Sequence, residues 1–102
     1  MSTIKIGSDE RNLEDADPHW ITQEIQTRRA DGQSVCVIVT INTGELNLRL
    51  ATPTCGGGGG GGRPPTEREK AILDLWNERG LNQADFSPGE VVAFVKQVRR
   101  FI

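Results

Sequence analysis

Three side chains in this sequence are of the types that act as nucleophiles, proton carriers or zinc ligands: Cys36, Cys55 and His19. A thiol needs a neighbouring base to become a nucleophile, and His19 is the only imidazole in the sequence. The three residues follow neither a C-x-x-C nor an H-x-x-x-H spacing, whereas a structural zinc site usually takes four side-chain ligands. The sequence therefore predicts no metal and no cofactor. A catalytic site remains a minor hypothesis, which requires His19 and Cys36 to lie within hydrogen-bonding reach.

Both cysteines are expected to be reduced. The sequence shows neither the apolar core of a signal peptide nor the roughly 18 to 20 apolar residues of a membrane helix, so we expect a soluble cytoplasmic protein. Cytoplasmic thiols are kept reduced. On this interpretation Cys36 is a small apolar filler of a strand, whereas Cys55 is exposed beside a linker.

Seven consecutive glycines occupy positions 56–62, and a G-x-G-x-x-G pattern matches them only because every position is glycine. A dinucleotide-binding loop needs a helix that opens directly after it, but Arg63-Pro64-Pro65 follows here. The Gly-Lys-Ser/Thr of a Walker loop is also absent from the sequence. A polyglycine run cannot bury apolar surface to offset its ordering entropy. We interpret residues 53–65 as a flexible Gly-rich linker inside a single domain of residues 1–102.

The carboxylates indicate helix capping rather than catalysis. Several lie in an acidic loop expected at residues 8–16, and Asp17, Glu67, Glu69 and Glu90 lie at predicted helix starts, where the helix dipole favours negative charge. An acyl or group transferase would need a convergent nucleophile, base and oxyanion donor, and no such set can be assembled. The sequence therefore predicts a protein that is not an enzyme.

Five basic residues end two of the predicted helices, where cations favour the negative end of the helix dipole. They also form a candidate basic patch for nucleic acid, provided that they converge on one face. The net charge of −2 argues against strong sequence-independent attraction to nucleic acid. The five residues are Arg28, Arg29, Lys96, Arg99 and Arg100.

Three helices are predicted from apolar periodicity together with capping residues. The first follows Asp17, a good N-cap, with proline at the first helical position. The other two begin with capping-box patterns, Thr66 with Glu69 and Ser87 with Glu90. The expected ranges are 18–30, 66–79 and 88–101.

Two runs rich in β-branched residues and leucine, 35–41 and 46–52, flank an Asn-Thr-Gly-Glu turn and predict a β-hairpin. Pairing Ile41 with Leu46 places the valines of the first run and the leucines of the second on one apolar face. The opposite face is mixed, and we take four of its residues as a candidate interaction surface: Ile38, Thr40, Asn47 and Arg49.

Together these elements predict an α+β fold, in which three helices cover the apolar face of a small antiparallel sheet. Residues 3–6 alternate polar and apolar and are a candidate third strand. A chain of 102 residues is long enough for one core and too short for two independent ones.

The fold and the missing catalytic set favour a non-enzymatic protein-protein interaction or adaptor module. It would bind a protein partner, or a second copy as a homodimer, through the mixed face or an exposed edge of the hairpin. The alternative is a nucleic-acid-binding accessory protein that uses the basic residues at the ends of the first and third helices.

Overall fold

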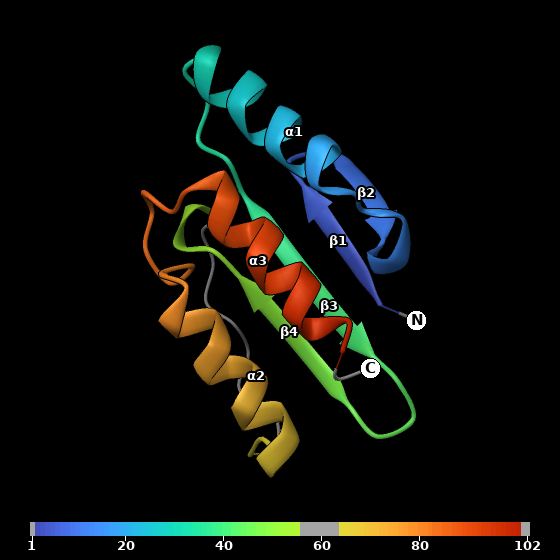
Figure 1. Ribbon diagram of the computed structural model, residues 1–102. Coiled ribbons are helices and arrows are strands. Elements are labelled where there is room, and N and C mark those ends of the chain that lie inside the picture. The colour runs from blue at the N-terminus through green and yellow to red at the C-terminus, as the bar shows by residue number, and fades with distance from the viewer. Residues whose placement is uncertain (1, 56–63, 101–102) are drawn as a thin grey trace.

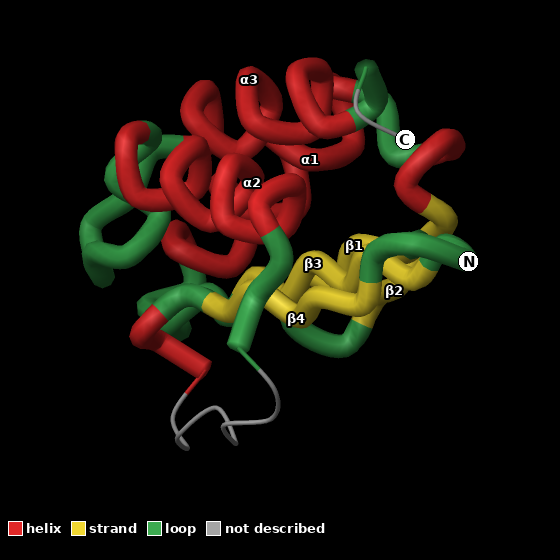
Figure 2. Tube along the Cα trace, turned by 90° about the horizontal axis from the view of Figure 1, so that it is seen from below, coloured by secondary structure: helices red, strands yellow, loops and turns green. Residues whose placement is uncertain are grey.

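The computed structural model describes residues 2–55 and 64–100 and shows the expected α+β architecture. A four-stranded antiparallel sheet, in the order β2-β1-β3-β4, is covered by three helices that all lie on one of its faces (Figures 1 and 2). The elements in chain order are β1 (Thr3–Ile6), β2 (Asp9–Asn12), the 3-10 turn η1 (Leu13–Asp15), α1 (Pro18–Ala30), β3 (Val37–Asn42), β4 (Asn47–Ala51), the 3-10 turn η2 (Pro53–Cys55), α2 (Glu67–Glu78) and α3 (Pro88–Val98).

The candidate strand at residues 3–6 is confirmed as β1, but the prediction of a loop at residues 8–16 is wrong. Gly7, with a φ of +62°, opens a two-residue turn that pairs Ile6 with Asp9 and turns the acidic segment into an edge strand, β2. All four residues of β2 are exposed, and none is apolar. The strand therefore lacks the alternation by which a strand is identified in sequence, and its backbone pairing with β1 defines it.

The hairpin of β3 and β4 forms, but its register differs from the expected one by two residues. Ile41 pairs with Leu48 and Val39 with Leu50, instead of Ile41 with Leu46. The hydroxyl of Thr43 accepts the backbone N–H of Leu46 at 3.0 Å. This bond helps to hold the observed turn, whose centre lies one residue later in the sequence than the centre of the predicted turn. Because side chains alternate with a period of two, the shift leaves the predicted division of residues between the two faces intact.

The predicted caps form at two helices; at the third, Ser87 is the N-cap residue as predicted, but the capping box with Glu90 does not form. The carboxylate of Asp17 accepts the N–H of Trp20 at 2.7 Å, and Thr66 with Glu69 forms the full capping box of α2. Ser87 makes no side-chain cap bond; instead, the carboxylate of Glu90 lies 3.8 Å from Arg79. The helix α3 ends at Val98 rather than extending to residue 101, which lies outside the described residues.

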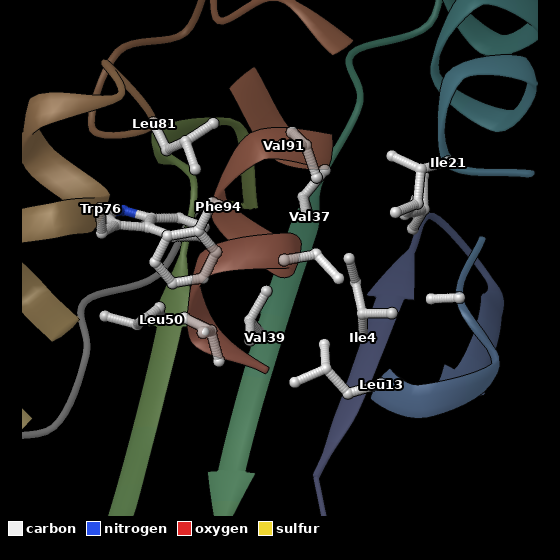
Figure 3. Close-up of a cluster of buried hydrophobic side chains, with 14 of the residues drawn as sticks. Ile4, Leu13, Ile21, Val37, Val39, Leu50, Trp76, Leu81, Val91 and Phe94 are labelled. Carbon is white, nitrogen blue, oxygen red and sulfur yellow. The ribbon is translucent and has the colours of Figure 1, made fainter. Parts of the chain in front are cut away.

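The core lies between the helix layer and the apolar face of the sheet. The rings of Trp76 from α2 and Phe94 from α3 meet edge to face, with centroids 5.1 Å apart and planes at 82° (Figure 3). Phe94 is fully buried, as are Val39 of β3 and Ile4 of β1. The two aromatic rings thus join α2 and α3 over the centre of the sheet.

The segment interpreted as a linker is structured at its start. Pro53–Cys55 forms η2, and residues 56–63 lie outside the described residues. None of the helices in the described ranges has the length and apolar character that a membrane span requires.

Candidate functional site

The outer edge of β4 is the feature of the sheet best suited to contact a partner. Thr43 donates its N–H to the carbonyl of Leu46 at 2.8 Å, and Thr52 donates to the carbonyl of Val37 at 3.0 Å, so alternate residues of β4 bond to β3. Within β4, Leu48 and Leu50 are therefore the residues whose backbone groups bond to β3. The backbone N–H and C=O groups of Asn47, Arg49 and Ala51 therefore point away from the sheet.

The beginning of this edge is closed by α2. The Glu69 carboxylate, only 1 % exposed, accepts the N–H of Asn47 on one oxygen at 2.8 Å and the N–H of Thr66 on the other at 2.9 Å. Among the described residues, no group accepts the N–H of Arg49 or Ala51. The free part of the edge is therefore a short segment between the Glu69 contact and Pro53.

We expect Glu69→Gln to lower the free energy of unfolding by about 1 to 2 kcal/mol, because a charge-assisted hydrogen bond is lost at a buried position. Denaturant unfolding measures the change. Glu67→Gln, at an exposed position of the same helical turn, is the matched control and should change stability by less than about 0.5 kcal/mol. Equal effects of the two changes would contradict the role assigned to Glu69.

A groove of about 470 Å³ runs along this free edge, and we call it the β4 groove. Leu73, Trp76 and Asn77 of α2 line its helix side. Arg49, Leu50 and Ala51 of β4 line its strand side, together with Ile38 of β3. Pro53 and the two cysteines also line it. The groove thus combines an apolar wall with backbone groups that have no partner among the described residues.

Arg49 supplies the charge of the β4 groove, because no other charged side chain is among the described lining residues. It is exposed, and its side chain makes no ion pair or hydrogen bond with a described residue. Most other arginines in the described ranges do have such partners: Arg11, Arg28, Arg29, Arg68, Arg79 and Arg99.

The four residues of the predicted interaction surface lie on the sheet face that carries no helix, which we call the open face (Figure 2). Thr40 pairs with Arg49 on one side and with Thr3 on the other. Ile38 pairs with Ala51. Ile38 and Arg49 line the β4 groove, whereas Thr40 and Asn47 are not among its lining residues. Half of the predicted surface therefore belongs to the groove.

Cys36 and Cys55 form a disulfide, which corrects the expectation that both are reduced. Their Cα atoms lie 4.6 Å apart, which is a normal separation for a disulfide. The catalytic hypothesis around Cys36 fails for the same reason, because a disulfide sulfur cannot act as the thiol that this hypothesis needs. His19 lies exposed in the first turn of α1.

The turn that carries Cys55 is also held by a chain of hydrogen bonds. The hydroxyl of Thr52 accepts the N–H of Val37 at 3.1 Å and lies 2.7 Å from the hydroxyl of Thr54. The hydroxyl of Thr54 donates to the carbonyl of Val35. These two threonines, which we call the threonine clamp, fasten η2 to the start of β3 independently of the disulfide.

The residues of the predicted basic patch do not gather on one face. The helices α1 and α3 run in opposite directions side by side, so their C-terminal ends lie at opposite ends of the helix layer (Figure 1). Arg28 and Arg29 end α1, and Arg99 caps α3. Lys96 in the last turn of α3 and Arg100 just beyond it are both exposed.

Three of these arginines contact other parts of the protein: Arg28, Arg29 and Arg99. Arg99 donates to the carbonyls of Leu13, Glu14 and Ala16, which precede α1. Arg29 donates to the carbonyl of Phe86, and its guanidinium carbon lies 4.8 Å from the centre of that ring. Each helix end is thus bound to the segment that leads into the other helix.

Arg28 lies against Asp9 of β2 and Glu24 of α1, at 3.3 and 3.4 Å. Its guanidinium also covers Gly7, where an added Cβ would come within 2.5 Å of the Arg28 Cζ. A hydrogen bond with Asp9, then burial and the nearby negative charge of Asp9, raise the pKa of Glu24 above its ordinary value. Through its contacts with Gly7, Asp9 and Glu24, Arg28 joins the β1-β2 turn to α1.

A larger cavity of about 630 Å³ lies beside η1 and the β3-β4 turn. Arg99 is the one basic group among its described lining residues, and its guanidinium is already bound to backbone carbonyls. We therefore take the β4 groove, with its unpaired arginine and backbone groups, as the candidate site. Among the residues described, no cluster of three or more histidine, cysteine or acidic side chains is arranged to hold a metal ion.

Comparison with family models, with curated proteins and with solved structures finds no match for this chain.

Proposed function

We propose that this chain is a non-enzymatic binding module that takes an extended segment of a protein partner as an additional strand beside β4. The observation that carries the proposal is the pair of backbone N–H groups, on Arg49 and Ala51, that point into a groove without an acceptor among the described residues. An extended peptide satisfies such groups through its own carbonyls, and the neighbouring groove receives its alternate side chains.

The opposite edge of the sheet is less suited to this role. All four residues of β2 are exposed and polar or charged, with the sequence Asp-Glu-Arg-Asn. Charged residues on a short edge strand discourage the pairing of a further strand. None of the described groove residues comes from β2, whereas α2 provides β4 with an apolar wall.

A second copy of this chain is a less favourable occupant than a different partner. A two-fold axis at Arg49 would set two arginines without counter-ions opposite each other, and like charges in that position are destabilising. A two-fold axis at Leu50 would place Ala51 of the other copy opposite each Arg49, so the arginine would gain no counter-ion. A partner strand of another sequence can supply a carboxylate instead.

The disulfide also bears on where such binding takes place. Disulfides persist mainly in oxidising compartments, because the cytosol keeps thiols reduced. We therefore favour an oxidising compartment over the cytoplasmic location expected from the sequence.

The proposal predicts a defined effect of proline at the β4 edge. Ala51→Pro removes an N–H that points away from β3, so the hydrogen bonds between β3 and β4 remain. Peptides selected by the wild-type protein from a phage-displayed random dodecamer library should bind this variant about tenfold more weakly, because one backbone hydrogen bond is lost. Fluorescence titration gives the dissociation constants.

Asn12→Pro is the matched control, because it removes an outward N–H from the other edge, at a residue whose φ of −61° already suits proline. It should leave peptide binding unchanged. Hydrogen exchange supplies a second measurement: the amides of Arg49 and Ala51 should exchange rapidly in the free protein and slowly in the complex. Slow exchange before peptide is added would show that the edge is already covered and would overturn the proposal. So would selected peptides that bind both proline variants equally well.

A further inference from the structure

The β4 groove also indicates what kind of segment it accepts, an inference that rests on the proposed strand addition. We propose that the groove selects an extended segment in which an acidic residue is flanked by apolar residues. In either strand direction, the residue opposite Arg49 places its side chain on the open face, and its neighbours face the helix side with Leu48 and Leu50.

The acidic position follows from Arg49. This side chain is exposed, lacks a partner among the described residues and is the only charge among the described lining of the groove. A guanidinium presents paired donors that match the two oxygens of a carboxylate. A carboxylate opposite Arg49 is therefore attracted, whereas a lysine at that position would be repelled.

The apolar positions follow from the helix side of the groove. Leu50 is 3 % exposed and Trp76 is 4 % exposed, while Leu73 is half-buried at the groove surface. Figure 3 shows Leu50 on β4 in the same cluster of buried side chains as Trp76 on α2. A valine or isoleucine that enters from the groove would remove the exposed part of this apolar wall from water.

Two synthetic probes test the inference, an acetylated Ser-Thr-Val-Glu-Val-Thr-Ser amide and the same peptide with lysine in place of glutamate. The wild-type protein should bind the glutamate peptide about fivefold more tightly than the lysine peptide, an effect of the size expected for a solvent-exposed ion pair. Arg49→Glu should reverse this preference, and Arg49→Ala should abolish it. Arg100→Glu changes another exposed arginine without a side-chain partner among the described residues and should keep the wild-type preference.

Leu73→Asn tests the apolar wall, and it should weaken the binding of both peptides by a similar factor. Equal binding of the two probes to the wild-type protein, or a preference that Arg49→Glu leaves unchanged, would overturn the inference about the acidic position. If those same peptides still lose affinity with Ala51→Pro, strand addition itself stands. If neither these probes nor the library peptides respond to Ala51→Pro, the proposed function fails as well.

Discussion

Phe94→Ala is expected to lower the free energy of unfolding by about 3 to 5 kcal/mol, the cost of removing a fully buried aromatic side chain. Phe94 is 0 % exposed and contacts the Trp76 ring edge to face. Its removal leaves a cavity where α2, α3 and the sheet meet. Because a four-stranded sheet of this size depends on packing by helices, the loss should weaken the whole fold rather than α3 alone.

Urea or guanidinium unfolding, followed by tryptophan fluorescence and by circular dichroism, measures this loss. The two signals should change together, because Trp76 reports the core and circular dichroism reports the helices. Phe94→Leu keeps most of the volume and should cost clearly less than the alanine variant. Val92→Ala, at a partly buried position of the same helix, is the matched control. A similar loss for Val92→Ala and Phe94→Ala would show that Phe94 does not occupy the centre of the core.

Loss of the disulfide is the second large effect. The bond joins residues 19 positions apart, and closure of a loop of that length in the unfolded chain contributes about 3 kcal/mol to stability. The double variant Cys36→Ser/Cys55→Ser should be destabilised by about that amount. Its native topology should remain, because the threonine clamp still fastens η2 to β3.

Two measurements check this expectation. Protein denatured without reductant should show no titratable thiol, and two after reduction, since both cysteines of the chain are paired. Reductant should lower the unfolding midpoint of the wild type but not that of the double variant. Thiols that titrate before reduction, together with a midpoint that reductant leaves unchanged, would contradict the disulfide.

The sequence by itself determined the features that depend on neighbouring residues. Asp17 and Thr66 cap their helices by bonds to residues three positions ahead, so each cap can be recognised within one turn. The alternation of Val37, Val39 and Ile41 assigns each side chain to a face even though the register was displaced by two residues. The four residues of the candidate surface were for this reason placed correctly on one face.

Tertiary contacts decided what this local pattern does not encode. The strand β2 has no apolar residue, so only its pairing with β1 defines it. If the observed register is continued past the start of β3, position 36 lies opposite position 53, and η2 then brings Cys55 back within bonding distance. Sequence spacing could not reveal this disulfide, because both the true register and the 3-10 turn are needed to place Cys55.

Tertiary packing also decided where the predicted functional residues lie relative to one another. All five members of the predicted basic patch are favourable at a helix C-terminus, but the antiparallel packing of α1 and α3 separates them and binds Arg29 and Arg99 to backbone carbonyls. Leu73 and Trp76 were visible in the sequence only as apolar residues of a helix. Their role beside Arg49 depends on the position of α2 along β4, which the buried Glu69 carboxylate sets by accepting the N–H groups of both Asn47 and Thr66. Sequence thus determined which face of each element is apolar, whereas long-range packing decided which charges and backbone groups have no partner among the described residues.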